Sequence, residues 1–231
     1  VHAVAHVMEM QDRHGEGIEW ITGLQPHWQQ ANNFRYHLWW HRALMHLGRG
    51  EADEALRLYD ESIWDPNSDE YLDLCNDVSL LLRLELLGVD TGDRGAVLAD
   101  MAEARIGDHT LAFTEMHNMM ILAREGRHES ADKLLASLQD FAQTPNNFAA
   151  ATMQPVAIPL CQAILAHANG DLAARIPHAR GPPFAAIDDI FVAIAFDPRL
   201  DIGGVRTRRI GLGHQEGGAD LAVHQRLQPL I

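Results

Sequence analysis

The sequence predicts an all-α fold in which antiparallel helix pairs stack into a solenoid, followed by an irregular C-terminal tail. Apolar residues recur at three- and four-residue steps from Val1 to about residue 174, which is typical of helices with one buried face. A turn usually centred on Gly returns along the same range, and strand signals are scarce there. Together these observations predict roughly ten helices before the tail.

The repeat is clearest at its turns. We expect them at Asp12, Gly50, Gly92, Gly126 and Gly170, with spacings of 38, 42, 34 and 44 residues. A spacing of 34 is the period of tetratricopeptide repeats, and longer spacings imply insertions between units. Residues 1–176 are therefore expected to form a tetratricopeptide-like domain of about five helix pairs.

Each part of the repeat has a physical reason. Gly accepts the positive φ that ends the first helix of a pair. A small residue five positions after the turn, such as Ala55 or Ala131, lets two helices cross closely, and Val97 takes this place in the third unit. A second packing column, seven residues before the turn, holds Ala5, Ala43 and Ala163.

Beyond residue 176 the pattern stops. Residues 177–231 hold 12 Gly or Pro among 55 residues, and pairs such as Gly203-Gly204 break any long helix. Two interpretations compete: an irregular or disordered tail, or an off-frame translation, which in a GC-rich gene yields Arg, Gly, Ala and Pro. The break falls inside a repeat that has begun its second helix, which favours the off-frame interpretation.

The formal charge of −14 lies entirely in residues 1–176, because the tail has six Arg and six acidic residues. Such a surface repels phosphate backbones, so we expect no nucleic acid partner. It suits a cationic peptide or a metal ion, and it is also an ordinary means of staying soluble.

Several features indicate the compartment. The two cysteines form no metal-binding motif or disulfide framework, so we expect a reducing, cytoplasmic setting. The bias of 17 Arg against one Lys indicates a GC-rich bacterial genome. No signal peptide is visible and no apolar run approaches the roughly 20 residues of a membrane span, so no membrane contact is expected. The first residue is Val1 rather than Met and lies in a helical pattern, so we expect an excerpt of a longer chain.

Histidines are concentrated near the N-terminus, where seven of the 14 fall within the first 46 residues. His2 and His6 form one His-x-x-x-His pair, and His37 and His41 form another. Residues four apart lie on one helix face, and Glu9 extends the face of the first pair.

The repeat register predicts where these side chains point. In tetratricopeptide solenoids the first helix of each pair lines the concave surface. Counting back from each turn, the column nine residues earlier reads Ala3, His41, Arg83, His117 and Cys161. Trp40 adds flat apolar area of the kind found in binding hot spots. The candidate groove residues are His2, His6, Glu9, His37, Trp40, His41, Arg83 and His117.

Three functions fit this surface. The first is a binding or scaffold module whose groove holds a protein, a peptide or a small polar ligand. The second is structural, with histidines that hydrogen-bond across helices and fasten adjacent repeats. The third is a divalent transition-metal site formed by His2, His6, Glu9, His37 and His41, which in a metal-dependent, hydrolase-like enzyme would activate a water molecule.

The sequence favours the binding module and predicts no cofactor. It contains no phosphate-cradling Gly loop or nucleophile elbow, so no catalytic residue is assigned. Glu9 follows the second His of its pair instead of lying between the two, unlike the helical zinc-protease motif. Imidazole nitrogens of both pairs converging within roughly 4–5 Å would favour the metal, and imidazoles spread along a groove would favour a ligand.

Four segments carry a family resemblance. They are His2–Met10, the His37-Leu-Trp-Trp-His41 segment, Leu58–Ile63 and Pro159–Ala163. In these the chain resembles the tetratricopeptide repeat protein 38 family over about residues 1–174. The resemblance implies a superhelical solenoid with further helices upstream, and implies little about activity. Members continue with further helix pairs and a Gly-Gly-Ser-containing stretch after the Pro159 segment, and this sequence does not.

Overall fold

The structure, a computed structural model, describes residues 1–170, and within this range it is all-helical, with no strand. The predicted fold class is confirmed at this level. The tail expected at 177–231 lies outside the described residues, as do both interpretations of it.

Eleven α-helices and two π-helical segments follow one another in the described range. They are α1 (His2–Met10), α2 (His14–Gly23), α3 (Gln25–Trp28), α4 (Phe34–Gly48), α5 (Ala52–Leu58), η1 (Tyr59–Ile63), α6 (Tyr71–Leu86), α7 (Arg94–Ala104), α8 (Ala112–Arg124), α9 (His128–Phe141), α10 (Phe148–Thr152), η2 (Met153–Ala157) and α11 (Ile158–Ala168).

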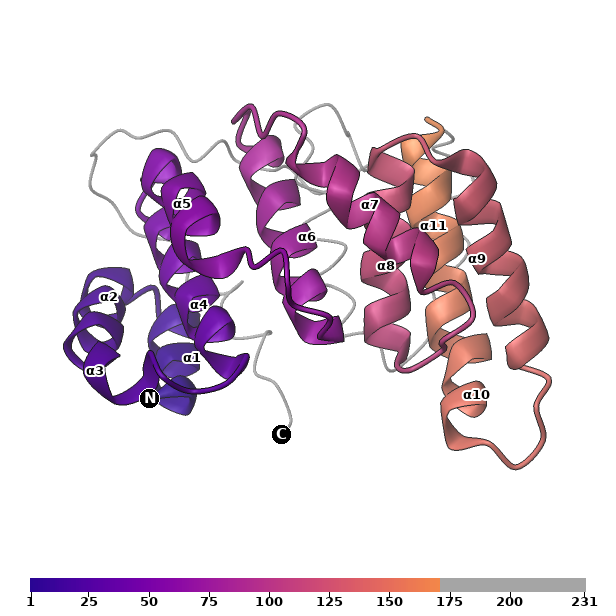
Figure 1. Cartoon of the computed structure of the whole chain (residues 1–231), viewed down its shortest axis with the longest axis horizontal. Coiled ribbons are helices and arrows are strands. Elements are labelled where there is room, and N and C mark those ends of the chain that lie inside the picture. The colour runs from indigo at the N-terminus through magenta and orange to yellow at the C-terminus, as the bar shows by residue number, and fades with distance from the viewer. Residues whose placement is uncertain (171–231) are drawn as a thin grey trace, which may run out of the picture. The chain divides into compact units, whose positions relative to one another are not determined.

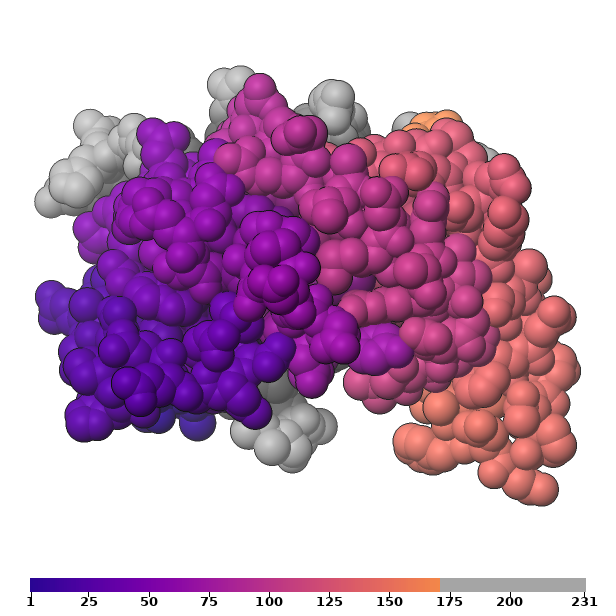
Figure 2. Space-filling view, viewed as in Figure 1, coloured from indigo at the N-terminus to yellow at the C-terminus, as the bar shows by residue number. Residues whose placement is uncertain are grey.

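The helices pack in pairs along the chain. α1 contacts α2, α4 contacts α5, α6 contacts α7, and α8 contacts α9 (Figure 1). The leading helix of each pair also contacts the leading helix of the next, in the order α1, α4, α6, α8 and α11. Side chains fill the spaces between the ribbons on the face shown in Figure 2. Side chains of successive leading helices can therefore meet.

Four of the turns share one geometry and one register. Asp12, Gly50, Gly88 and Gly126 all have positive φ, at 56°, 76°, 83° and 66°, and each lies 38 residues after the one before it. At each turn the next residue donates its N–H to a carbonyl five residues back, for example Val89 to Leu84. This bond satisfies a carbonyl that the helix end leaves unpaired.

The position of the third turn differs from the predicted position. The turn was expected at Gly92, but α6 ends at Leu86 and the helix-ending turn is at Gly88. The spacing of 34 residues therefore disappears. Residues 89–93 form a longer connection to α7, so Val97 does not take the small-residue position: it is 43% exposed, while Gly95 is buried. Ala5, Ala43, Ala55, Ala131 and Ala163 are buried as expected.

A compact core supports the first helices. Ala5, Ile21, Trp28, Leu38 and Met45 pack together from α1 to α4. Gly17 on α2 allows this packing, because a Cβ there would lie 2.5 Å from the Met45 sulfur. This core holds α1 against α4.

One apolar segment differs from expectation. The continuous helical stretch Phe148–Ala168 has 21 residues, and an 18-residue window within it has a mean hydropathy of 1.5, so by length and composition it is able to cross a membrane. Gln154, Pro155 and Pro159 interrupt the apolar run in the sequence, so no segment of membrane-spanning length was predicted. In the structure the stretch packs against α8 and α9, as a core helix does, and core helices pass the same test. The absence of membrane contact stays a prediction.

The turn geometry predicts a stability difference between two Gly-to-Ala variants. Gly88→Ala places a Cβ on a residue with φ of 83°, so it should lower the free energy of unfolding by about 1–2 kcal/mol. The matched control is Gly23→Ala, at the end of α2, where an added Cβ meets no atom within 4 Å and φ is not positive. Urea denaturation followed by circular dichroism measures both. Equal stabilities of the two variants would contradict the assigned turn.

Candidate metal centre

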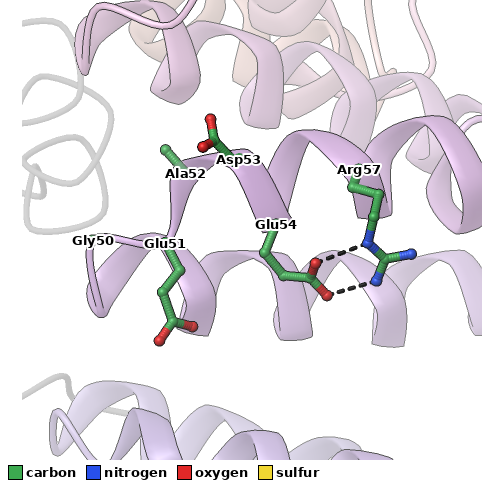
Figure 3. Close-up of a pocket in the computed structure, with 6 residues that line it drawn as sticks. All are labelled: Gly50, Glu51, Ala52, Asp53, Glu54 and Arg57. Atoms are coloured by element: carbon green, nitrogen blue, oxygen red, sulfur yellow. Dashed lines mark hydrogen bonds and ion pairs between the residues drawn. The ribbon is translucent and has the colours of Figure 1, made fainter.

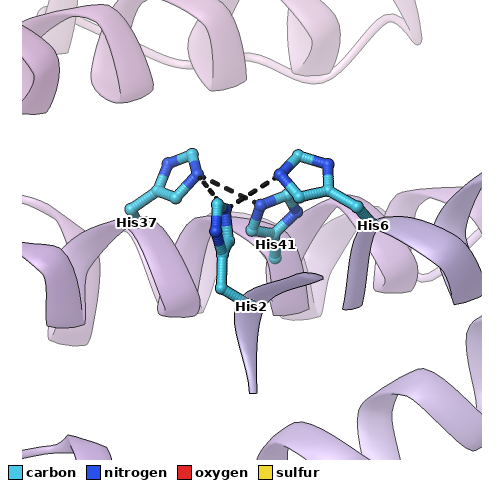
Figure 4. Close-up of side chains that lie close together, drawn as sticks. All are labelled: His2, His6, His37 and His41. Atoms are coloured by element: carbon cyan, nitrogen blue, oxygen red, sulfur yellow. Dashed lines mark hydrogen bonds between the residues drawn. The ribbon is translucent and has the colours of Figure 1, made fainter. Parts of the chain in front are cut away.

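Four imidazole rings converge between α1 and α4. His2 and His6 come from α1, and His37 and His41 come from α4 (Figure 4). One ring nitrogen from each of the four lies within 4.8 Å of the corresponding nitrogen in every other ring. The spacing of four residues places each pair on one helix face, and the contact of α1 with α4 brings the two faces together.

The contacts run through the same atom of each ring. His6 Nε2 lies 2.8 Å from His2 Nε2, and His2 Nε2 lies 2.9 Å from His37 Nε2. His37 Nε2 lies 3.1 Å from His41 Nε2. The four Nε2 atoms thus face a common centre, as metal ligands would.

Each of the two histidines on α4 makes a second hydrogen bond through Nδ1, the ring nitrogen that faces away from the cluster. His37 Nδ1 lies 2.9 Å from Asn76 Oδ1 on α6, and His41 Nδ1 lies 2.9 Å from Glu9 Oε2 on α1. The His41 side chain is 1% exposed and that of Glu9 is 29% exposed. A ligating histidine typically makes this kind of second hydrogen bond, which fixes the ring orientation and the tautomer.

These partners determine where the protons are. A carboxylate oxygen only accepts hydrogen bonds, so His41 carries a proton on Nδ1. With the amide oxygen of Asn76 facing it, His37 also carries its proton on Nδ1. In the neutral rings both Nε2 atoms then present lone pairs, and these face each other across 3.1 Å. Neutral imidazoles cannot satisfy that contact, whereas a bound cation can.

The cluster also resists protonation. Burial, followed by the charges that His37, His41 and His6 would carry, lowers the pKa of His2 to about 4. Burial lowers the pKa of His37, although the hydrogen bond that His37 donates to Asn76 raises it, and burial and His41 lower the pKa of His6. The three rings are therefore neutral at pH 7, which is the form that binds metals.

The remaining predicted residues lie beside the cluster, not within it. The Trp40 indole stacks on the His37 ring at 5.2 Å, and its Nε1 donates to Ser79 Oγ at 2.9 Å. The Arg83 guanidinium carbon lies 5.9 Å from the Trp40 ring centroid. His117 on α8 is buried, and its Nδ1 donates to the Phe113 carbonyl oxygen.

The corrected register changes the position of Arg83. Relative to Gly88 the column nine residues earlier contains Ser79, so Arg83 was wrongly aligned with His41 and His117. Asn76 was missed altogether. A signal was present in the sequence, because Asn76, Asp77 and Ser79 interrupt an otherwise apolar run. The structure shows that all three are buried on α6.

Two buried acids on α6 and α8 were also missed. Burial raises the pKa of Asp77 well above its ordinary value, with Asp73 as a second cause. Burial raises the pKa of Glu115 to about 7. Asp77 Oδ1 and Glu115 Oε2 have no hydrogen-bond partner among the described residues.

A separate pocket lies at the start of α5, lined by residues 50–54 and Arg57 (Figure 3). Arg57 donates two hydrogen bonds to Glu54, at 2.8 and 2.6 Å, and also pairs with Glu61. This pocket includes none of the residues predicted from the sequence.

No protein-family model matches the chain, and no solved structure matches it. The resemblance to the tetratricopeptide repeat protein 38 family therefore stays a prediction.

The lowered pKa of His2 predicts a pH effect on the metal-free protein. The folded pKa of about 4 lies below the unfolded value of 6.5, so protonation favours unfolding, and stability is lost as the pH falls from 6.5 towards 4. His2→Gln should lose less free energy of unfolding between pH 7 and pH 5 than the wild type. Asp77 and Glu115 titrate in both proteins, so the difference isolates His2.

The measurement is urea denaturation at several pH values with a chelator present. His27→Gln, which alters an exposed histidine outside the cluster, is the matched control. An identical pH dependence in wild type and His2→Gln would contradict the described environment of His2.

Proposed function

We propose that this protein binds one divalent transition-metal ion through the Nε2 atoms of His2, His6, His37 and His41. The observation that supports the proposal best is the 3.1 Å contact of two Nε2 atoms whose protons are held on the opposite ring nitrogens. An ion at the common centre accepts all four lone pairs and removes their mutual repulsion.

The dimensions are close to those of a tetrahedral site. With Zn–N bonds of 2.0–2.1 Å, tetrahedral ligand atoms lie about 3.3 Å apart. Three of the six nitrogen–nitrogen separations measure 2.8, 2.9 and 3.1 Å, and all six lie within 4.8 Å, so the rings must turn towards one common point to hold the ion.

The ligand type selects the metal. Imidazole nitrogens suit Zn²⁺, Cu²⁺, Ni²⁺ and Fe²⁺, whereas Mg²⁺ and Ca²⁺ require oxygen ligands. The negative charge of Glu9, which accepts a hydrogen bond from His41 Nδ1, makes the His41 ring a stronger electron-pair donor to a metal ion. One carboxylate beside four imidazole nitrogens favours a soft or borderline cation over a hard one.

We further infer that the helix pairs form a tetratricopeptide-like solenoid, in agreement with the family resemblance. The shared register of the four turns and the contacts between successive leading helices support this. The 38-residue register departs from the tetratricopeptide period of 34. In such a scaffold the metal would join the first two helix pairs.

The proposal predicts stoichiometric metal binding. Purified protein dialysed against Zn²⁺ should hold one ion per chain by plasma mass spectrometry, and the ion should raise the melting temperature. A metal concentration of 100 times Kd adds about 2.7 kcal/mol to the free energy of unfolding. His37→Ala should abolish both effects, while the matched control His27→Ala should keep them. Wild-type protein without bound metal would refute the proposed function.

The hydrogen bond behind His41 predicts a smaller effect. Glu9→Gln removes the charged acceptor of His41 Nδ1 while all four rings remain. Metal affinity should fall about 10–100-fold, as is usual when such a partner is lost. Competition titration with a chromophoric chelator measures the change. Glu19→Gln, at an acidic residue on α2, is the matched control, and equal affinities of the two variants would contradict the role of Glu9.

A further inference from the structure

A serine, a histidine and a glutamate lie next to one another on elements that do not carry the candidate metal centre. Ser137 is on α9, His109 is in the connection between α7 and α8, and Glu115 is on α8, which packs against α9 (Figure 1). Ser137 Oγ lies 2.9 Å from His109 Nε2. His109 Nδ1 lies 3.9 Å from Glu115 Oε1. The imidazole therefore lies between the hydroxyl and the carboxylate, with one ring nitrogen towards each.

The surroundings of His109 hold its ring in this orientation. The ring stacks on Phe141, which lies one turn after Ser137 on α9, with centroids 4.5 Å apart and an interplanar angle of 19°. His109 has a φ of 50°, which is uncommon for a residue other than glycine. His109 and Glu115 are buried, whereas Ser137 is half-buried. Ser137 is thus the residue of the three that a reagent in solution reaches first.

The protonation states suit transfer of a proton from the serine to the histidine. Burial lowers the pKa of His109, against the charge of Asp108, so the ring is neutral at pH 8. Burial raises the pKa of Glu115 to about 7, so its carboxylate is mostly ionised at pH 8. The ionised carboxylate favours a proton on His109 Nδ1, which has no hydrogen-bond partner among the described residues. Nε2 then accepts the hydrogen bond of the Ser137 hydroxyl.

We propose that Ser137 is an activated nucleophile that takes up an acyl group from an activated acyl donor, with His109 as its general base. A nucleophile in hydrogen-bond reach of a base that a third group orients is the usual arrangement of such sites. Ser137 Oγ forms a bond to the acyl carbon, and its proton passes to His109 Nε2. The bond from that carbon to the leaving group breaks, and the leaving group departs with the electron pair. A phenolate or a thiolate departs without a proton, so the donor is an aryl ester or a thioester.

Glu115 stabilises the charge that the proton transfer creates. After the transfer, His109 carries a proton on both ring nitrogens and is positively charged. The carboxylate lies within ion-pair distance of Nδ1, and the contacts of such sites are often long before the reacting group is bound. Glu115 is a positioning residue, because it acts on the serine only through His109. None of the three residues is a proposed metal ligand, so this inference is independent of the proposed metal site.

The test uses the full chain with p-nitrophenyl acetate at pH 8, with a chelator present to exclude metal chemistry. Mass spectrometry of proteolytic peptides should locate a stable acetyl group on Ser137. Release of p-nitrophenolate does not identify the site, because histidine side chains also react with such esters. The rate at which the acetylated Ser137 peptide accumulates is therefore the quantity to measure.

A serine on the same helix supplies the matched control. Ser130 is also half-buried on α9, but its hydroxyl donates to Glu103 Oε1 at 2.9 Å and has no imidazole beside it. Ser130 should therefore be acetylated at least about 100-fold more slowly than Ser137, as the usual contribution of a general base requires. Ser137→Ala should abolish the adduct at this position, and Ser130→Ala should leave the acetylation of Ser137 unchanged.

Two further variants assign the other roles. His109→Gln removes the base and should slow acetylation of Ser137 about 100-fold or more. Glu115→Gln should slow it less, and should slow it no further in a chain that already carries His109→Gln. A merely structural role of Glu115 would slow the reaction equally in both chains. Circular dichroism melts establish that each variant is folded.

Each result supports or overturns the inference. If wild-type Ser137 is acetylated no faster than Ser130, the activated nucleophile is refuted, and this comparison needs no variant to fold. If folded His109→Gln reacts as fast as the wild type, the role of His109 is refuted. If Glu115→Gln slows the reaction equally with and without His109→Gln, the positioning role is refuted.

Discussion

The arrangement of the site depends on two hydrogen bonds that face away from it. Asn76 and Glu9 take the Nδ1 protons of His37 and His41, which leaves two lone pairs opposed at the centre. The helix packing makes this possible, because Asn76 lies on α6 and Glu9 lies on α1, on either side of α4. Three helices thus determine the protonation of two rings, and the position of α1 becomes coupled to the chemistry of the centre.

Much of this arrangement could be predicted from the sequence. Two His-x-x-x-His pairs in helical segments must each present both rings on one face, since the α-helix repeats every 3.6 residues. The convergence of the pairs was predicted only as one alternative, since it depends on how α1 and α4 pack. Ala5 and Gly17 decide that packing: a small side chain and a missing Cβ let α1 and α2 approach α4. The sequence shows where the small residues are, but it does not show the direction from which α1 and α2 approach α4.

The two errors of the sequence-based prediction, the position of the third turn and the omission of Asn76, each have a structural cause. Gly88 and Gly92 both have positive φ, so either residue fits a helix-ending turn when judged from sequence. The bond from Val89 N–H to the Leu84 carbonyl selects Gly88, and no residue type encodes that bond by itself. The resulting shift of four residues misaligned Arg83. Asn76 escaped notice for a different reason: its amide matters only because α6 lies against α4, a contact 39 residues away from His37 in the chain.

Counting protons favours the proposed metal site over a merely structural cluster. Histidines that fasten two helices need one proton for every nitrogen–nitrogen contact, and this cluster has three such contacts among four rings. The Nδ1 protons of His37 and His41 are already donated outward, so only His2 and His6 can supply protons to the centre. Those two protons can serve only the His6–His2 and His2–His37 contacts. No proton is then left for the contact between His37 and His41. Adding a proton to His37 would charge a ring whose pKa is already lowered by burial. The proposed divalent ion would satisfy all three contacts at once, because it would accept a lone pair from each Nε2 atom.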